Sequence, residues 1–246
     1  MAGLTPVSPR LVLFDVDGTL LRAAGAGRRA LENAFRTVFG VDGIAEVSAG
    51  VRFEGRTDPA IIADMAESAG LDPVAVARRG EEMTRVYLRE LRAELARPDP
   101  RRAVTPGVVP LLDTLRPLPS VRLGLITGNI EPAAREKLRS FALDEYFPDG
   151  GFASDHEDRS EIARIARERV SRRTGIPFEP AQTVVVGDTE QDVTCARDNG
   201  YAVILVETGW IPRERLVASR PDALFEDFRD RDAVLAALGV FTAASD

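Results

Sequence analysis

A short apolar run that ends in two aspartates is the feature that most limits how this chain can fold. The residues Leu11–Phe14 are followed directly by Asp15-Val16-Asp17-Gly18-Thr19. Four consecutive apolar residues that end in a glycine-containing turn are typical of a strand buried on both faces of a parallel sheet. Such a sheet needs helices on its two faces, so the first residues of the chain already favour an α/β fold.

The pattern becomes helical between about residues 27 and 96. Apolar residues recur at helical spacing in three successive segments, and glycines or cap residues mark the segment ends. Thr57 or Asp58 can cap the second of these helices, with Pro59 in its first turn. The stretch Arg97-Pro98-Asp99-Pro100 then indicates a linker.

Strands and helices alternate again after this linker. We expect strands at Val121–Ile126, Gly151–Ala153, Thr183–Val186, Ala202–Val206 and Ala223–Phe225, and helices at Glu131–Ser140, Arg159–Arg173, Glu190–Asn199 and Arg229–Leu238. This alternation predicts an α/β three-layer sandwich around a parallel, Rossmann-like sheet. We assign residues 1–21 and 101–246 to this core, and residues 22–100 to a helical cap domain inserted after the first strand.

Polar residues follow three of the predicted strands. Asp15 and Asp17 end the first strand, Thr127-Gly128-Asn129 ends the second, and Gly187-Asp188 ends the third, with Asp192 four residues later. Ligands bind beyond the carboxyl ends of parallel strands, so these groups should converge. Like charges repel strongly in a desolvated site, which calls for a divalent cation. Ligands that offer only oxygen favour Mg²⁺, and the absence of histidine and cysteine from these clusters argues against zinc.

The same groups suit phosphoryl transfer, which needs a nucleophile, charge neutralisation and a proton donor for the leaving group. The Thr127 hydroxyl and the amides of Gly128 and Asn129 are neutral donors for a phosphoryl oxygen.

Three motifs, in this order, resemble signatures of the haloacid dehalogenase superfamily. Asp15-Val16-Asp17-Gly18-Thr19-Leu20 is similar to the first signature, Ile126-Thr127-Gly128-Asn129 to the second, and Gly187-Asp188-Thr189-Glu190-Gln191-Asp192 to the fourth. The helical segment after the first motif resembles the alpha-helical cap of the phosphoglycolate phosphatase-like branch. The resemblance covers nearly the whole chain and implies a Mg²⁺-dependent phosphatase.

The resemblance also implies a role for each matching residue. Asp15 is expected to attack phosphorus and carry the phosphoryl group, while Asp17 protonates the leaving oxygen and later deprotonates water. Mg²⁺ would be held by the Asp15 side chain, the Asp17 carbonyl and Asp188, with Asp192 supporting its water shell. Thr127 would hold a phosphoryl oxygen.

The third signature departs from the superfamily pattern. It is usually a lysine a few tens of residues before the fourth signature, whereas the only lysine of this chain, Lys137, follows the second motif. We expect Lys137 to be a surface lysine, the common fate of a lysine on a helix. Arg159 is the expected substitute, because arginine is always charged and can bind phosphate.

Three further residues have both a functional and a structural interpretation, and two others have only a structural one. Arg56 and Arg22 are candidate substrate-binding residues, although each could equally be a plain loop arginine. Trp210 could border the site or simply pack. We expect His156 to be a surface residue and Cys195 to serve packing.

Other members of the superfamily supply the alternatives. Phosphonoacetaldehyde hydrolase-like members use a cap lysine, and this cap has none. The same absence makes a phosphosugar mutase less favoured. Dehalogenases lack the second aspartate of the first motif, which is present here as Asp17. A non-catalytic binding module on the same fold stays open.

The composition limits the kinds of partner that we expect for this protein. The net charge is −7, which argues against nucleic acid. There is no apolar run of about 18 residues for a membrane span, and Met1–Pro9 lacks a signal-peptide pattern. With one cysteine, these features favour the cytoplasm. The expected substrate is a small phosphorylated metabolite, such as phosphoglycolate or a sugar phosphate. The sequence does not determine the oligomeric state.

Overall fold

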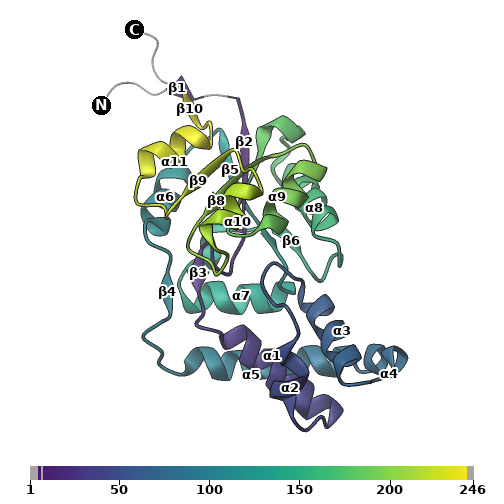
Figure 1. The fold of residues 1–246 in the computed structure, drawn as a ribbon. Helices are drawn as coiled ribbons and strands as arrows, with labels where there is room; N and C mark the ends of the chain where they lie inside the picture. The colour runs from purple at the N-terminus through teal and green to yellow at the C-terminus, as the bar shows by residue number, and fades with distance from the viewer. Residues whose placement is uncertain (1–4, 7, 243–246) are drawn as a thin grey trace.

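The computed structural model describes residues 5, 6 and 8–242, which form a sheet with flanking helices and a second group of helices beside its lower edge (Figure 1). Residues 1–4, 7 and 243–246 of the expected core domain lie outside the described residues. Within the described part, none of the helices combines the length and apolar character needed to cross a bilayer.

A six-stranded sheet forms the centre of the larger part, in the order β6-β5-β2-β7-β8-β9. The strands are β2 (Arg10–Phe14), β5 (Val121–Thr127), β6 (Gly150–Phe152), β7 (Thr183–Gly187), β8 (Ala202–Val206) and β9 (Ala223–Phe225). Every neighbouring pair is parallel. The predicted parallel α/β fold is confirmed, and β2 lies between the two strands that precede the other motifs.

The strand β2 shows why the first apolar run folds as it does. Leu11 and Leu13 pack into the hydrophobic cluster on one face of the sheet. Val12 and Phe14 pack into the cluster on the other face. Successive side chains of a strand point to opposite faces, so a strand covered on both sides must be apolar throughout.

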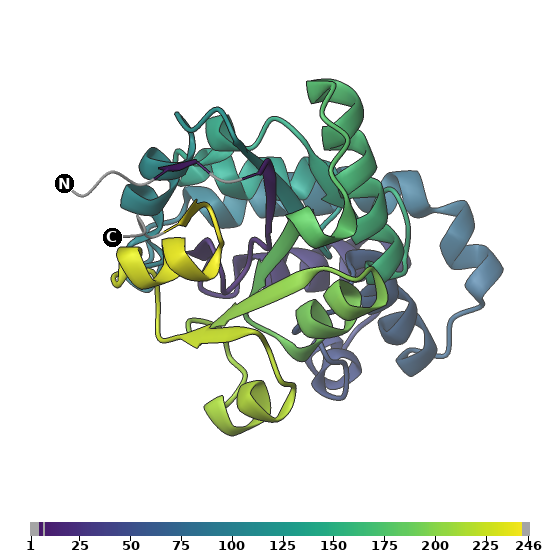
Figure 2. The same ribbon diagram turned by 90° about the horizontal axis from the view of Figure 1, so that it is seen from above.

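Helices cover both faces of the sheet (Figure 2). One face carries α6 (Val108–Leu115), α7 (Glu131–Ser140) and α11 (Arg231–Ala237). The other carries α8 (Arg159–Thr174), α9 (Glu190–Asp198) and α10 (Arg213–Ala218). The two faces have separate apolar clusters, which is the expected three-layer arrangement.

The second group of helices has an apolar core of its own, and we call it the five-helix segment (residues 26–96). It contains α1 (Ala26–Phe39), α2 (Ile44–Ala49), α3 (Asp58–Ser68), α4 (Pro73–Arg78) and α5 (Gly80–Ala96). The short strands β3 (Leu21–Arg22) and β4 (Ala103–Val104) pair antiparallel, so the chain enters and leaves this segment side by side. The boundaries at residues 22 and 100 stay a prediction about domain organisation.

The remaining elements are short. Strands β1 (Thr5–Pro6) and β10 (Phe241–Thr242) pair antiparallel, and two 3-10 turns lie at Asp144–Tyr146 and Pro180–Gln182. These four elements are not predicted from the sequence.

Candidate active site

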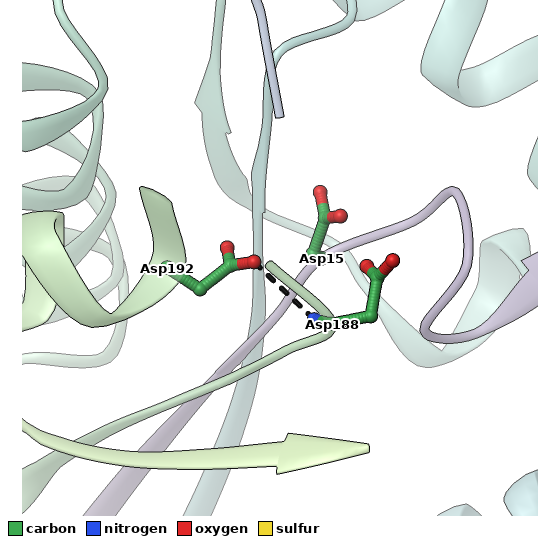
Figure 3. Close-up of side chains that lie close together, drawn as sticks. All are labelled: Asp15, Asp188 and Asp192. Atoms are coloured by element: carbon green, nitrogen blue, oxygen red, sulfur yellow. Dashed lines mark hydrogen bonds between the residues drawn. The ribbon is translucent and has the colours of Figure 1, made fainter. Parts of the chain in front are cut away.

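Three carboxylates meet beyond the carboxyl ends of β2 and β7 (Figure 3). Asp15, Asp188 and Asp192 each offer an oxygen that lies within 4.8 Å of the others, and all three side chains are buried. The strand order explains the convergence, since the strands that carry Asp15 and Asp188 are hydrogen-bonded neighbours.

The charges of this cluster are poorly compensated by the protein alone. Burial raises the pKa of Asp15 to about 7, and the Asp192 and Asp17 carboxylates add to the rise while Arg159 opposes it. Burial, together with Asp15 and Asp192, also holds the pKa of Asp188 well above its usual range. The buried Oδ2 of Asp188 has no hydrogen-bond partner among the described residues. Carboxylate oxygens that lack a partner fit a hard divalent cation such as Mg²⁺.

Asp192 has a fixed orientation because it belongs to the capping box of α9, in which Thr189 is the N-cap. Its Oδ2 accepts hydrogen bonds from the Thr189 hydroxyl at 2.7 Å, from the Thr189 amide at 3.0 Å and from the Asp188 amide at 3.3 Å. A Cβ on Gly187 would lie 2.1 Å from Cγ of Asp192, so the last position of β7 has room only for glycine. The cap therefore holds both aspartates in one rigid turn.

Arg159 is the cation closest to the nucleophile candidate. Its Nη2 lies 2.6 Å from Oδ1 of Asp192 and 3.1 Å from Oδ1 of Asp15. The residue is the first of α8, and the preceding Asp158 caps that helix by accepting from the Ser160 amide. The structure thus places Arg159 where the sequence analysis expects a cation, and its catalytic role stays a prediction.

Lys137 corrects one expectation, because the surface position predicted for it is wrong. Its side chain is only 5% exposed, and its Nζ contacts Oδ2 of Asp17 and Oδ1 of Asn129. The physical reason is its place on the buried face of α7, one helical turn from Ala133 and Ala134. The sequence shows the helical spacing that places Lys137 on the same face as Ala133 and Ala134. It does not show the contact with Asp17, which lies 120 residues away.

The loop after β5 connects the second motif to the first. Asn129 donates from Nδ2 to Oδ2 of Asp17 at 2.9 Å and to Oγ1 of Thr127 at 3.0 Å. Its backbone amide also donates to Oγ1 of Thr127, at 3.2 Å. A Cβ on Gly128 would lie 2.2 Å from the carbonyl oxygen of Arg56, so this loop lies directly against the five-helix segment.

Two residues near the carboxylates were not assigned a role by the sequence analysis. Thr19, within the first motif, donates its hydroxyl to Oδ1 of Asp188 at 3.0 Å. Asp58, treated there only as a cap candidate, is buried and accepts from the Ile130 amide at 2.9 Å. The cap of α3 is instead Thr57. The sequence gives no signal of these contacts, because the partners lie 169 and 72 residues away along the chain.

A cavity of about 700 Å³ opens between these groups and the five-helix segment, and Arg22, Arg56 and Trp210 are among its lining residues. Arg22 donates from Nε to the Thr208 carbonyl at 2.7 Å. Arg56 pairs with Asp64 at 2.6 Å. Both arginines are therefore partly committed to protein partners.

The other two sequence expectations concern residues away from the carboxylates. His156 is exposed. Cys195 is buried and packs in the apolar cluster under α9. Both expectations are confirmed, and neither side chain lines the cavity.

The aspartates cluster beyond the carboxyl ends of parallel strands, beside the five-helix segment, which is where open α/β sheets bind ligands. A family model described as haloacid dehalogenase-like hydrolase matches residues 9–200. The chain belongs to this family, and the resemblance seen in its motifs is confirmed.

Relatives and neighbours of this chain have different activities in their names. A tyrosine-protein kinase, PtkA, from Mycobacterium tuberculosis is 28% identical over 82% of this chain, and the chain spans only 63% of that relative's length. A phosphoglycolate phosphatase from Synechococcus elongatus is 30% identical over 87% of this chain and 92% of its own.

Solved structures show the same fold. CbbY from Rhodobacter sphaeroides, in complex with phosphate, aligns over 94% of this chain and 99% of its own with a TM-score of 0.70 and 21% identity. A predicted phosphoglycolate phosphatase from Haemophilus somnus aligns over 93% of this chain and 98% of its own with a TM-score of 0.64 and 20% identity.

Proposed function

We propose that this protein is a Mg²⁺-dependent phosphatase that hydrolyses a small phosphate monoester through a phosphorylated Asp15. One observation carries the proposal: the buried Asp15 carboxylate lies beside the Arg159 guanidinium and within 4.8 Å of the Asp188 and Asp192 oxygens. A carboxylate nucleophile next to a fixed cation and a cation-binding set is what phosphoryl transfer to an aspartate requires.

The reaction has two halves in this proposal. The Asp15 carboxylate attacks phosphorus while Asp17 gives a proton to the leaving oxygen, and Asp17 then takes a proton from the water that attacks the phosphoaspartate. Arg159 and the Thr127 hydroxyl bind phosphoryl oxygens, as do the amides of Gly128 and Asn129.

The carboxylates fit a resident cation. Mg²⁺ bound by Asp15, Asp188 and the Asp17 carbonyl, with Asp192 behind them, would neutralise charge on the phosphoryl group. The partnerless Oδ2 of Asp188 supports this assignment, because a buried carboxylate oxygen without a donor is unfavourable.

The cavity and the relatives support a substrate class. A cavity of about 700 Å³ suits a small phosphorylated metabolite, and Arg22 and Arg56 on its wall favour an anionic one. The phosphoglycolate phosphatase relative supports phosphoglycolate as a first candidate. A CbbY structure that holds xylulose-1,5-bisphosphate supports a sugar phosphate as a second. The charge of −7 disfavours nucleic acid, and we place the enzyme in the cytoplasm with no membrane partner.

The test is a hydrolysis screen over small phosphate monoesters with Mg²⁺ and with a chelator, using Asp15→Asn as the control. We expect turnover only with both Mg²⁺ and Asp15, and a trapped phosphoprotein when acetyl phosphate is the donor. Turnover that persists in Asp15→Asn would sink the mechanism. Isomerised sugar phosphates or released halide would favour the mutase or dehalogenase alternatives. No phosphoprotein and no turnover would favour the non-catalytic one.

The kinase relative defines a second candidate, phosphoryl transfer from a nucleotide to a tyrosine hydroxyl. The likeness to PtkA over 82% of this chain is the observation that favours it. Labelled ATP with and without added tyrosine-containing peptide separates the two: label on peptide supports a kinase, whereas hydrolysis of monoesters without label transfer supports the phosphatase.

A further inference from the structure

The site contains two buried cations that serve different aspartates. Arg159 contacts Asp15 and Asp192, while Lys137 contacts Asp17. Within the described chain, Asp17 is the only carboxylate within 4.0 Å of the Lys137 ammonium. A buried ammonium needs such a partner, so the two side chains hold each other in place.

Lys137, Asn129 and Asp17 form a closed ring of hydrogen bonds. The ammonium donates to Oδ2 of Asp17 and to Oδ1 of Asn129, and Nδ2 of Asn129 donates to the same Oδ2 of Asp17 at 2.9 Å. Because an ammonium only donates and a carboxylate only accepts, the ring permits one orientation of the Asn129 amide. The ring therefore fixes one oxygen of Asp17 with two donors.

The other oxygen of Asp17 stays available for chemistry. No hydrogen bond between described residues involves Oδ1 of Asp17, whose side chain is 26% exposed toward the cavity. Lys137 also lines that cavity, with the glycine at position 27 opposite it: a Cβ there would lie 3.1 Å from Nζ. Lys137 thus contacts Asp17 at the wall of the cavity, whereas Arg159 contacts Asp15 and Asp192 there.

We propose that Lys137 is a positioning residue for proton transfer by Asp17, an inference that rests on the proposed phosphatase function. The ring holds Oδ2, so Oδ1 is the oxygen that exchanges a proton with the reacting groups. As the bond from Asp15 to phosphorus forms and the ester P–O bond breaks, a proton moves from Oδ1 to the leaving oxygen. In the second half, water gives a proton to Oδ1 as its oxygen bonds to phosphorus and the Asp15 oxygen departs.

The leaving group supplies the decisive test. General-acid catalysis contributes about 10²–10⁴-fold where the leaving oxygen needs a proton. We expect Lys137→Met to lower kcat/KM, which reports the first half of the reaction, by at least about tenfold for alkyl phosphates. For acetyl phosphate, whose leaving group needs no proton, the loss of kcat/KM should be much smaller. Lys137→Arg, which keeps a donor, should recover part of the alkyl phosphate activity. Equal losses across the ester series would show a purely structural role and overturn the proposal.

A matched control lies on the same helix. Glu136 is the neighbour of Lys137 and forms an exposed ion pair with Arg92 at 2.7 Å. Glu136→Gln should leave kcat/KM unchanged for every ester, since neither residue of this pair forms a hydrogen bond or ion pair with Asp17 in the described part of the chain. A loss that matched that of Lys137→Met would place the effect on the helix as a whole and contradict the proposal.

A spectroscopic experiment tests the contact between Lys137 and Asp17 even if Lys137→Met does not fold. Lys137 is the only lysine, so protein with ¹⁵N-labelled lysine gives one side-chain signal. Asp17→Asn should shift that signal, whereas Asp64→Asn, in the exposed pair with Arg56, should not. An unmoved signal in Asp17→Asn overturns the proposal even where phosphatase activity is found. A shifted signal in a protein that hydrolyses no ester overturns the proposed function and, with it, the role in proton transfer.

Discussion

Asp58 accepts a hydrogen bond from the Ile130 amide at 2.9 Å and thereby joins the first turn of α3 to the loop that follows β5. The amide of Asp58 donates in return to the Gly128 carbonyl at 2.7 Å. These two hydrogen bonds, one to the Asp58 side chain and one from its backbone amide, couple the five-helix segment to the loop that carries Thr127 and Asn129. Movement of that segment would therefore displace the groups that are proposed to bind the phosphoryl group.

Gly128→Ala tests this coupling. The added Cβ would lie 2.2 Å from the carbonyl oxygen of Arg56, so the two backbones must separate. We expect kcat/KM to fall by about tenfold or more, because small displacements of positioned groups are costly in catalysis. Gly50→Ala is the matched control, since a Cβ there meets nothing within 4 Å. Steady-state kinetics of both variants check this, and unchanged activity in Gly128→Ala would mean that the contact has no part in catalysis.

The pH dependence of stability follows from the buried carboxyls. Burial raises the pKa of Asp15 to about 7 and the pKa of Asp58 to about 6, although Lys137 and the Ile130 amide oppose the second shift. These groups bind protons more tightly in the folded than in the unfolded chain. The free energy of unfolding of the metal-free protein should therefore fall as pH rises from about 4 through about 7. For Asp58 alone the change is on the order of 3 kcal/mol.

Urea titrations in a chelator at about pH 5 and about pH 8 measure this fall. Asp58→Asn should flatten it. Added Mg²⁺ should stabilise the protein more at the higher pH, because the cation competes with protons for the carboxylates. A stability that rises over this interval in the metal-free protein would contradict the assignment of buried, protonated carboxyls.

The sequence predicted the sheet well for a physical reason. The segments Leu11–Phe14 and Val184–Val186 are apolar at every position, a pattern typical of strands buried on both faces of a sheet. The structure ends these strands within one residue of the expected bounds. Once the strand order is known, the meeting of Asp15 with Asp188 follows from the parallel pairing.

The side chains around that meeting point could not be predicted in the same way. The helical pattern of α7 shows that Ala133, Ala134 and Leu138 face inward, yet a lysine on that face is stable only with a partner. That partner is Asp17, far away in the sequence. Asp58 is similar, because a cap position explains an aspartate locally, whereas its observed contact is with Ile130. The environments of Lys137 and Asp58 are thus set by contacts between distant residues, which helical periodicity does not reveal.

Thr19→Val tests the support of the proposed cation site. The Thr19 hydroxyl donates to Oδ1 of Asp188 at 3.0 Å, and valine keeps the shape but loses the donor. Partners that orient a metal ligand typically contribute about 10–100-fold in metal affinity. We expect Mg²⁺ affinity, measured by calorimetry, to weaken within that range. Thr194→Val, on the exposed face of α9, should bind Mg²⁺ as the unaltered protein does. Equal affinity in all three proteins would remove Asp188 from the cation site.

Arg159 allows a last test, because its removal should cause a loss of stability and a separate loss of turnover. Arg159→Met leaves Asp15 and Asp192 buried without their cation, and breaking such a pair typically costs about 3–5 kcal/mol. Mg²⁺ should restore part of this stability by neutralising the same carboxylates, but it should not restore turnover, since the guanidinium also binds the phosphoryl group in the proposed mechanism. Arg159→Lys keeps the charge without the planar fork. Its stability and its kcat should lie between those of the unaltered protein and those of Arg159→Met. Urea titrations with and without Mg²⁺, beside kcat for the best ester, separate the effects. If Arg159→Met retains full turnover while Lys137→Met loses all of it, then Lys137 and not Arg159 is the cation on which the phosphoryl group depends.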